Sequence, residues 1–146
     1  MFVADEARVG VGFPVARARL EVLARSDALA RVSRDAYSGA PGVSRLVSVT
    51  FVDLAVRADS VILGVRWNAA GPDGVPFPAL DANITLTADG GQATVLRLEG
   101  ACRLPDAAPG PQPAAVIMNR AAMATVHSFV GRLADAIACP AGADQF

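Results

Sequence analysis

Side chains that bind metals or act as nucleophiles are scarce in this chain. Cys102 and Cys139 lie far apart, and His127 is the only histidine. A zinc site made of cysteine and histidine takes four ligands, so these three residues cannot complete one. We expect no metal site and no cofactor, and we expect both cysteines to be reduced thiols.

Acid–base chemistry has three candidate side chains, Tyr37, Asp53 and His127. Histidine titrates near neutral pH, but the adjacent Ser128 would point about 100° away from His127 on a helix and cannot be its nucleophile. We expect His127 at the helix surface. Asp53 interrupts an apolar strand in register with Phe51, and it is a candidate buried acid if that face points inward. The sequence leaves the face open.

Motifs for nucleotide binding and serine hydrolysis are missing as well. The chain has no Gly-x-Ser-x-Gly elbow and no phosphate-binding loop. Gly10 and Gly12 precede a helical segment, but the third glycine of a dinucleotide fingerprint does not follow. We interpret the two glycines as a kink in the opening strand.

The composition is that of one globular domain. The chain has 146 residues, of which 53% are hydrophobic and 18% charged, enough apolar material to bury a core. Its formal net charge is −1 and every basic residue is an arginine, so no positive excess is available for a nucleic-acid backbone. No segment reaches the ~18–20 apolar residues of a membrane span, and the early Asp5 and Glu6 are unlike a signal peptide. We therefore expect a cytoplasmic protein without a nucleic-acid partner or a membrane span.

The N-terminal part combines a strand with helices. Apolar residues alternate at positions 7, 9, 11 and 13, which predicts an opening strand. Pro14 suits the first turn of a helix, and Ser26 can cap a second one, so we expect two short helices before Gly39. The inward residues of the first are expected to be Val15, Ala18, Val22 and Leu23, and those of the second Ala28, Leu29, Val32 and Ala36.

The rest of the chain predicts an antiparallel sheet and one long helix. Strands are expected over 46–57, 61–67, 80–87 and 96–103, with a tight hairpin at Asp89-Gly90-Gly91. The last two strands alternate between apolar and polar residues, so one face of the sheet must be covered. A helical period over 114–138 predicts that cover, with an apolar face of Ala122, Val126, Phe129, Leu133 and Ile137. These elements form a single α+β domain over 1–146, with 139–146 as a flexible tail.

This order of elements resembles the START-like superfamily (SRPBCC, polyketide cyclase/dehydrase, Bet v 1-like) over nearly the whole chain. A more local likeness lies in Val65-Arg-Trp-Asn-Ala-Ala-Gly-Pro-Asp-Gly74 and Phe77-Pro-Ala-Leu-Asp-Ala-Asn-Ile-Thr-Leu86, which are similar to a stretch of uncharacterised actinobacterial members. Asn68 stands where that likeness leads us to expect an acidic residue. The resemblance implies a helix-grip fold, in which a curved antiparallel sheet wraps around a long C-terminal helix.

The resemblance also implies an elongated cavity between the sheet and the C-terminal helix. Gly100 is expected to leave space on the inward face of its strand. Trp67 can stack on a ligand ring at the cavity mouth or pack in the core, and Asn119 can contact a ligand or cap the preceding loop. The candidate ligand-binding residues are Trp67, Leu80, Leu98, Cys102, Asn119, Met123 and Val126.

Three classes of function follow from this interpretation. The first is binding of a hydrophobic or amphipathic small molecule, such as a lipid or a polyketide-like compound. The alternative is a polyketide cyclase or dehydratase-like enzyme in the same cavity, which requires Tyr37, Asp53 or His127 to point inward. A third is an interaction protein, marked by an exposed apolar patch. The oligomeric state stays open, with a homodimer among the alternatives.

Overall fold

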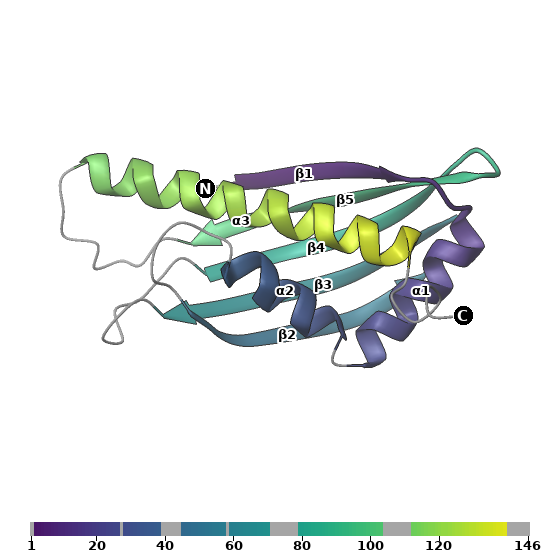
Figure 1. Ribbon diagram of the computed structural model, residues 1–146, viewed down its shortest axis with the longest axis horizontal. Helices are drawn as coiled ribbons and strands as arrows, with labels where there is room; N and C mark the ends of the chain where they lie inside the picture. Colours follow the sequence, from purple (N-terminus) through teal and green to yellow (C-terminus); the bar gives the residue numbers. More distant parts are fainter. Residues whose placement is uncertain are drawn as a thin grey trace.

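The computed structural model describes most of the chain as an antiparallel sheet with helices on one face (Figure 1). The described residues are 2–26, 28–38, 45–57, 59–70, 79–103 and 112–139. Within these ranges, the side chains of 34–38, 45–54, 68–70, 103, 112–119, 121 and 122 lie outside the description.

The elements follow the predicted order. The strands are β1 (Phe2–Val9), β2 (Arg45–Val56), β3 (Ser60–Ala70), β4 (Ala79–Asp89) and β5 (Ala93–Arg103), and the helices are α1 (Phe13–Arg25), α2 (Ala28–Ser38) and α3 (Gln112–Ala138). The order across the sheet is β1-β5-β4-β3-β2, and every neighbouring pair is antiparallel. α3 runs along β1 and β5, α2 lies beside α3, and α1 crosses one end of the sheet (Figure 1). The predicted α+β helix-grip architecture, with two short helices after the first strand, is confirmed.

The hairpin of β4 and β5 shows the predicted alternation most clearly. The even-numbered residues 80–86 of β4 are buried, whereas Asp81 and Asn83 are exposed. Leu96 and Leu98 of β5 are buried on the same face. The turn between the strands begins at Gly90, whose φ of 71° lies in the left-handed region that favours glycine. One face of this hairpin therefore meets water and the other meets the helices.

α1 is rotated relative to the prediction. Its buried residues are Phe13, Ala16 and Leu20. Val15 and Val22, predicted to face inward, are 44% and 65% exposed, Ala18 is exposed, and only Leu23 is partly buried. The predicted inward face of α1 was wrong because Phe13 fits the alternation of the preceding strand. In the structure Phe13 is the first residue of α1, after β1 has ended. Burial of this large side chain fixes which way the helix faces.

α2 agrees with the prediction where its side chains are described. Leu29 is fully buried, and Ala28 and Val32 are partly buried. The hydroxyl of Ser33 is also buried and donates a hydrogen bond to the carbonyl of Leu29, 3.1 Å away. The side chain of Ala36 lies outside the described residues.

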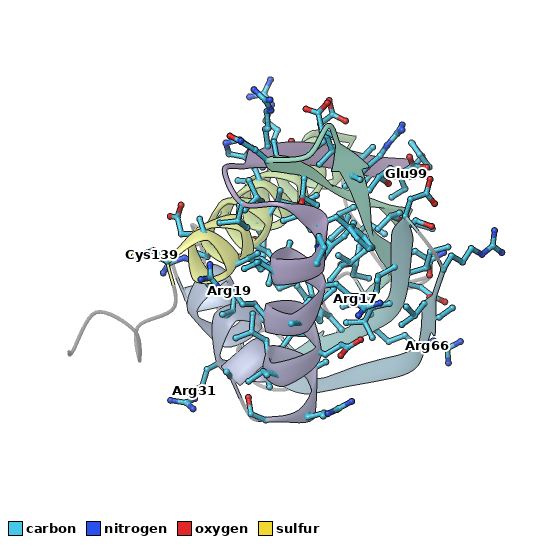
Figure 2. All side chains as sticks on the ribbon, turned by 90° about the vertical axis from the view of Figure 1, so that its right-hand side faces the viewer. Arg17, Arg19, Arg31, Arg66, Glu99 and Cys139 are labelled. Atoms are coloured by element: carbon cyan, nitrogen blue, oxygen red, sulfur yellow. The ribbon has the colours of Figure 1, made fainter. Side chains whose placement is uncertain are left out.

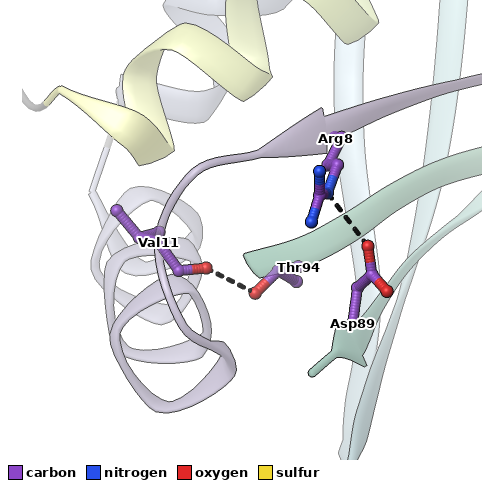
Figure 3. A network of polar contacts seen from close by, with 4 residues as sticks. All are labelled: Arg8, Val11, Asp89 and Thr94. Carbon is purple, nitrogen blue, oxygen red and sulfur yellow. Dashed lines mark hydrogen bonds and ion pairs between the residues drawn. The ribbon is translucent and has the colours of Figure 1, made fainter. Parts of the chain in front are cut away.

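Gly10 and Gly12 lie in the link between β1 and α1, and not in a kinked strand as predicted. Gly12 is the N-cap residue of α1, and a Cβ atom there would lie 2.9 Å from the carbonyl oxygen of Gly91. Beside it, the Thr94 hydroxyl donates to the carbonyl of Val11 at 2.9 Å (Figure 3). The start of α1 is therefore fixed closely against the β4–β5 hairpin.

α3 presents the predicted apolar face to the sheet. The described members of that face are all buried: Val126, Phe129, Leu133 and Ile137. At the end of α3, Nη1 of Arg19 donates to the carbonyls of Ile137 (2.6 Å) and Ala138 (3.2 Å). Carbonyls of a last helical turn have no partner within the helix, and a cation there also complements the helix dipole. None of the described helices is long and apolar enough to cross a membrane.

Candidate functional site

Three predicted ligand-binding residues gather in one row on the helix-covered face of the sheet. Trp67 of β3 is the register partner of Leu80 in β4, and Leu80 is the register partner of Cys102 in β5. Only 2%, 4% and 3% of their surfaces are exposed. Directly paired residues of antiparallel strands share a face, with Cβ atoms about 5 Å apart. We call Trp67, Leu80 and Cys102 the inner row.

α3 closes over the sheet beside the inner row. The ring of Phe129 meets the ring of Trp67 edge to face, with centroids 4.9 Å apart and planes at 88°. Phe129 is fully buried, and the predicted site residues Leu98 and Val126 are buried as well. The structure therefore packs Trp67 against α3. Phe129 was missed as a site residue, although the sequence placed it on the correct helix face.

Gly100 does not leave the space predicted for it. A Cβ atom at Gly100 would collide with the backbone of β4, at the Asp81 carbonyl oxygen and the Ala82 Cα, and would lie 2.5 Å from the Ala82 Cβ. Ala82 is the register partner of Gly100, and it occupies the volume that the missing side chain was expected to vacate. The glycine therefore permits a close approach of β4 to β5.

Met123 lies at the surface and does not face the sheet as predicted. Its exposed fraction is 37%, whereas Val126 is 2% exposed. Residues three apart on a helix point roughly 60° apart, at about 100° per residue. That rotation moves Met123 from the buried face to its border, so it does not join the inner row.

The remaining candidates fall on side chains outside the described residues. Asn119 belongs to α3 and Tyr37 to α2, but their side chains are not described. The same holds for Asp53 in β2, where the strand register shifts between Val52 and Leu54. The regular alternation that predicted the direction of Asp53 is interrupted at that residue, so its role stays a prediction.

The two cysteines differ in their surroundings. Both are thiols, with Cys102 buried and Cys139 exposed. Burial raises the pKa of the Cys102 thiol, because a desolvated thiolate is disfavoured. Since the thiolate is the reactive form, burial disfavours Cys102 as a nucleophile, and its side chain adds a small, weakly polar surface to the inner row.

A polar pair that the sequence did not reveal connects β1 to α3. Nδ1 of His127 lies 2.9 Å from Oδ2 of Asp5. Asp5 has the same parity in β1 as the buried Val3 and Val9, and its register partner is the buried Leu98. The Asp5 side chain is 22% exposed, whereas that of His127 is 83% exposed. Alternation along β1 could have placed Asp5 on the inner face, but its partner is distant in sequence.

We predict that Asp5 and His127 stabilise the contact between β1 and α3 jointly. In a double-mutant cycle of Asp5→Ala and His127→Ala, the expected coupling is about 0.5–1 kcal/mol, near the top of the range for exposed pairs, because the carboxylate is mostly shielded from water. Urea unfolding of the four proteins measures it.

The comparison cycle uses Arg8 and Asp89, an ion pair of the same 2.9 Å length with side chains 71% and 47% exposed. Its coupling should be smaller. Equal couplings in the two cycles would show that the shielding of Asp5 contributes nothing.

An open cleft of about 550 Å³ lies at the other end of β4 and β5 from the inner row. Its lining consists of Arg8, Gly10, Asp89, Gly91, Gln92 and Ala93. Arg8 and Asp89 form their ion pair within it (Figure 3). Because the two charges neutralise each other in largely exposed positions, the cleft offers no unmatched charge to a ligand.

Comparisons with known proteins identify the fold. No family model and no curated protein matches the chain. Among solved structures, TTHA0849 from Thermus thermophilus is 13% identical with a TM-score of 0.51, over 97% of this chain and 99% of that one. DynU16, from the dynemicin biosynthetic locus, is 21% identical with a TM-score of 0.47, over 94% of this chain but 47% of its own. A START superfamily protein from Mycobacterium smegmatis is 12% identical with a TM-score of 0.38, over 90% of this chain and 96% of its own.

The chain spans about half the length of DynU16. The likeness to TTHA0849 extends over nearly the whole of both chains. Together with the strand order and the covering α3, it supports the helix-grip architecture. At this level of identity the likeness describes architecture, because one fold hosts many unrelated functions.

Proposed function

We propose that the chain binds a hydrophobic or amphipathic small molecule between the inner face of the sheet and α3, alongside the inner row. The observation that carries this proposal is the chemistry of that face. Among its described residues in β1, β3, β4 and β5, Asp5 is the only one with a charge. An apolar face with few polar groups suits a ligand that is itself mostly apolar.

The inner row narrows the class of ligand. The indole of Trp67 and the thiol of Cys102 flank Leu80 on adjacent strands, and they offer aromatic and soft, polarizable surface. Lipid chains and fused aromatic rings of the polyketide type both match such surface. A strongly charged substrate would lose its hydration there without an opposite charge to replace it.

The enzyme alternative has less support. It requires Tyr37, Asp53 or His127 to point inward, and His127 is 83% exposed and paired with Asp5 at the surface. The other two side chains lie outside the described residues. Within the described part of the inner face, the geometry favours a binding protein without catalysis.

The proposal predicts that ligand changes the fluorescence of Trp67, the only tryptophan. Titration with oleate, and separately with a hydroxyanthraquinone, should give a saturable change at one ligand per chain with at least one of the two. Thermal unfolding should shift in parallel, because a ligand at 100 times its Kd stabilises the folded state by about 2.7 kcal/mol.

A matched pair of variants locates the site. Cys102→Phe fills the inner row and should abolish binding while leaving a folded protein. Ala101→Phe adds the same ring to the preceding residue, which is exposed on the opposite face, and should bind normally. Unchanged fluorescence and melting with every apolar probe would overturn the proposal, and so would equal binding by the two variants.

A further inference from the structure

α1 carries apolar side chains on two opposite faces. Phe13, Ala16 and Leu20 are buried against the sheet. The outermost line of the helix is also apolar over its first three turns, formed by the exposed residues Pro14, Val15, Ala18 and Val22. A helix on a protein surface normally turns polar residues outward, and a helix that is apolar on all sides is normally covered. We call Pro14, Val15, Ala18 and Val22 the outer stripe.

Arginines surround the outer stripe. α1 contains three arginines and one glutamate, whereas the whole chain has a formal net charge of −1. In the view onto this end of the molecule, Arg17 lies on one side of α1 and Arg19 lies on the other, where Arg19 donates to the carbonyls of the last turn of α3 (Figure 2). Arg25, at the end of the stripe, is exposed. Glu21 offsets one charge through its 3.9 Å ion pair with Arg17.

This pattern of charge decides which partner fits. A second copy of α1 packed on the stripe would bring the arginines of both copies together, so self-association through this face is disfavoured. An anionic surface is complementary to them. Basic residues beside an exposed apolar line are the features by which helices lie in the interface of anionic membranes.

α1 is also placed where such a surface can reach it. It crosses one end of the sheet (Figure 1) and lies in the foreground when that end is seen face on (Figure 2). Its buried face is anchored by Phe13 and Leu20, and Arg19 links it to the last turn of α3. Docking would therefore use a preformed, rigid helix.

We propose that α1 docks the protein on the surface of an anionic lipid membrane, with the outer stripe inserted between headgroups and the exposed Arg25 against lipid phosphates. This inference goes beyond small-molecule binding and stands independently of it. Membranes concentrate apolar compounds, so the two properties together would let the protein collect a ligand at the bilayer surface.

The experiment is co-sedimentation with vesicles of equal parts phosphatidylcholine and phosphatidylglycerol, compared with vesicles of phosphatidylcholine alone. The wild-type chain should bind the anionic vesicles, and binding should weaken as salt screens the charges. Val22→Asp should weaken binding by about tenfold or more. The substitution removes apolar surface that would enter the membrane, and it adds a negative charge that the anionic lipids repel. Arg25→Glu should weaken binding as well and reduce its dependence on salt.

The control is Phe2→Asp, at a side chain 68% exposed against 65% for Val22 but located at the start of β1. It should bind vesicles like the wild type. No binding to anionic vesicles at low salt would overturn the inference, as would equal losses in Phe2→Asp and Val22→Asp. A wild-type dimer that Val22→Asp converts to a monomer, without vesicle binding, would instead assign the stripe to a second copy. Ligand titration of Val22→Asp in solution separates this result from the proposed function, because the inner row is unaltered.

Discussion

Gly100→Ala is expected to cost about 3 kcal/mol or more of folding free energy, one of the largest effects of a single methyl group in this chain. The added Cβ would collide with the backbone of β4 at Asp81 and Ala82. Backbone in the middle of a sheet cannot move aside as a flexible side-chain end can. β5 lies between β1 and β4, so a displacement there disturbs two strand pairs.

The matched control for Gly100→Ala is Gly131→Ala in α3. A Cβ at Gly131 meets no atom within 4 Å, and replacing a helical glycine by alanine typically stabilises by about 0.5–1 kcal/mol. Thermal unfolding should therefore show opposite shifts, with a fall of roughly 10 °C for Gly100→Ala and a rise of a few degrees for Gly131→Ala. A Gly100→Ala protein as stable as the wild type would mean that β4 and β5 are not so closely apposed.

Phe129→Ala is expected to destabilise the protein by about 3–5 kcal/mol. Phe129 is fully buried between α3 and the sheet, and its ring contacts that of Trp67 edge to face. Removing the ring leaves a cavity and also breaks an aromatic pair, which contributes about 0.5–1.5 kcal/mol beyond burial. Emission of Trp67 should shift to longer wavelength as its surroundings open to water.

Urea unfolding followed by Trp67 fluorescence measures both effects of Phe129→Ala. Arg120→Ala, an exposed position of the same helix, should change stability by no more than about 0.5 kcal/mol. Phe129→Leu should fall between the two, because it keeps most of the apolar volume. A small loss in Phe129→Ala, with unchanged emission, would contradict the packing of α3 on Trp67.

The parts of the fold that the sequence predicted well are those in which one physical rule acts alone. β4 is half-buried and has no competing signal, so its alternation indicated both the strand and its inward face. The inward face of α1 was harder to predict, because Phe13 fits the alternation of the preceding strand and is also the first residue of the helix. The tertiary burial of that ring decided which faces of α1 point inward and outward, and it left Val15 and Val22 exposed.

For the candidate site, the alternation along each strand predicted which face of the sheet a side chain occupies. The spacing between neighbouring strands could not be predicted. Leu80 and Cys102 were assigned to the correct face. Gly100 shows the limit, because a glycine on an inward face fits both an open space and a close contact, and the strand register decides between them. The partner of Asp5 could not be predicted either, because the packing of α3 on β1 places His127 beside it.

Native mass spectrometry is the most direct test of ligand binding at the inner row. The purified chain would be measured alone, after incubation with a total lipid extract and an aromatic polyketide mixture, and again after mild organic extraction. We predict a non-covalent adduct of one small molecule per chain, which extraction removes and Cys102→Phe prevents. The bare mass of the chain under every condition, or an adduct that Cys102→Phe retains in full, would contradict binding at this site.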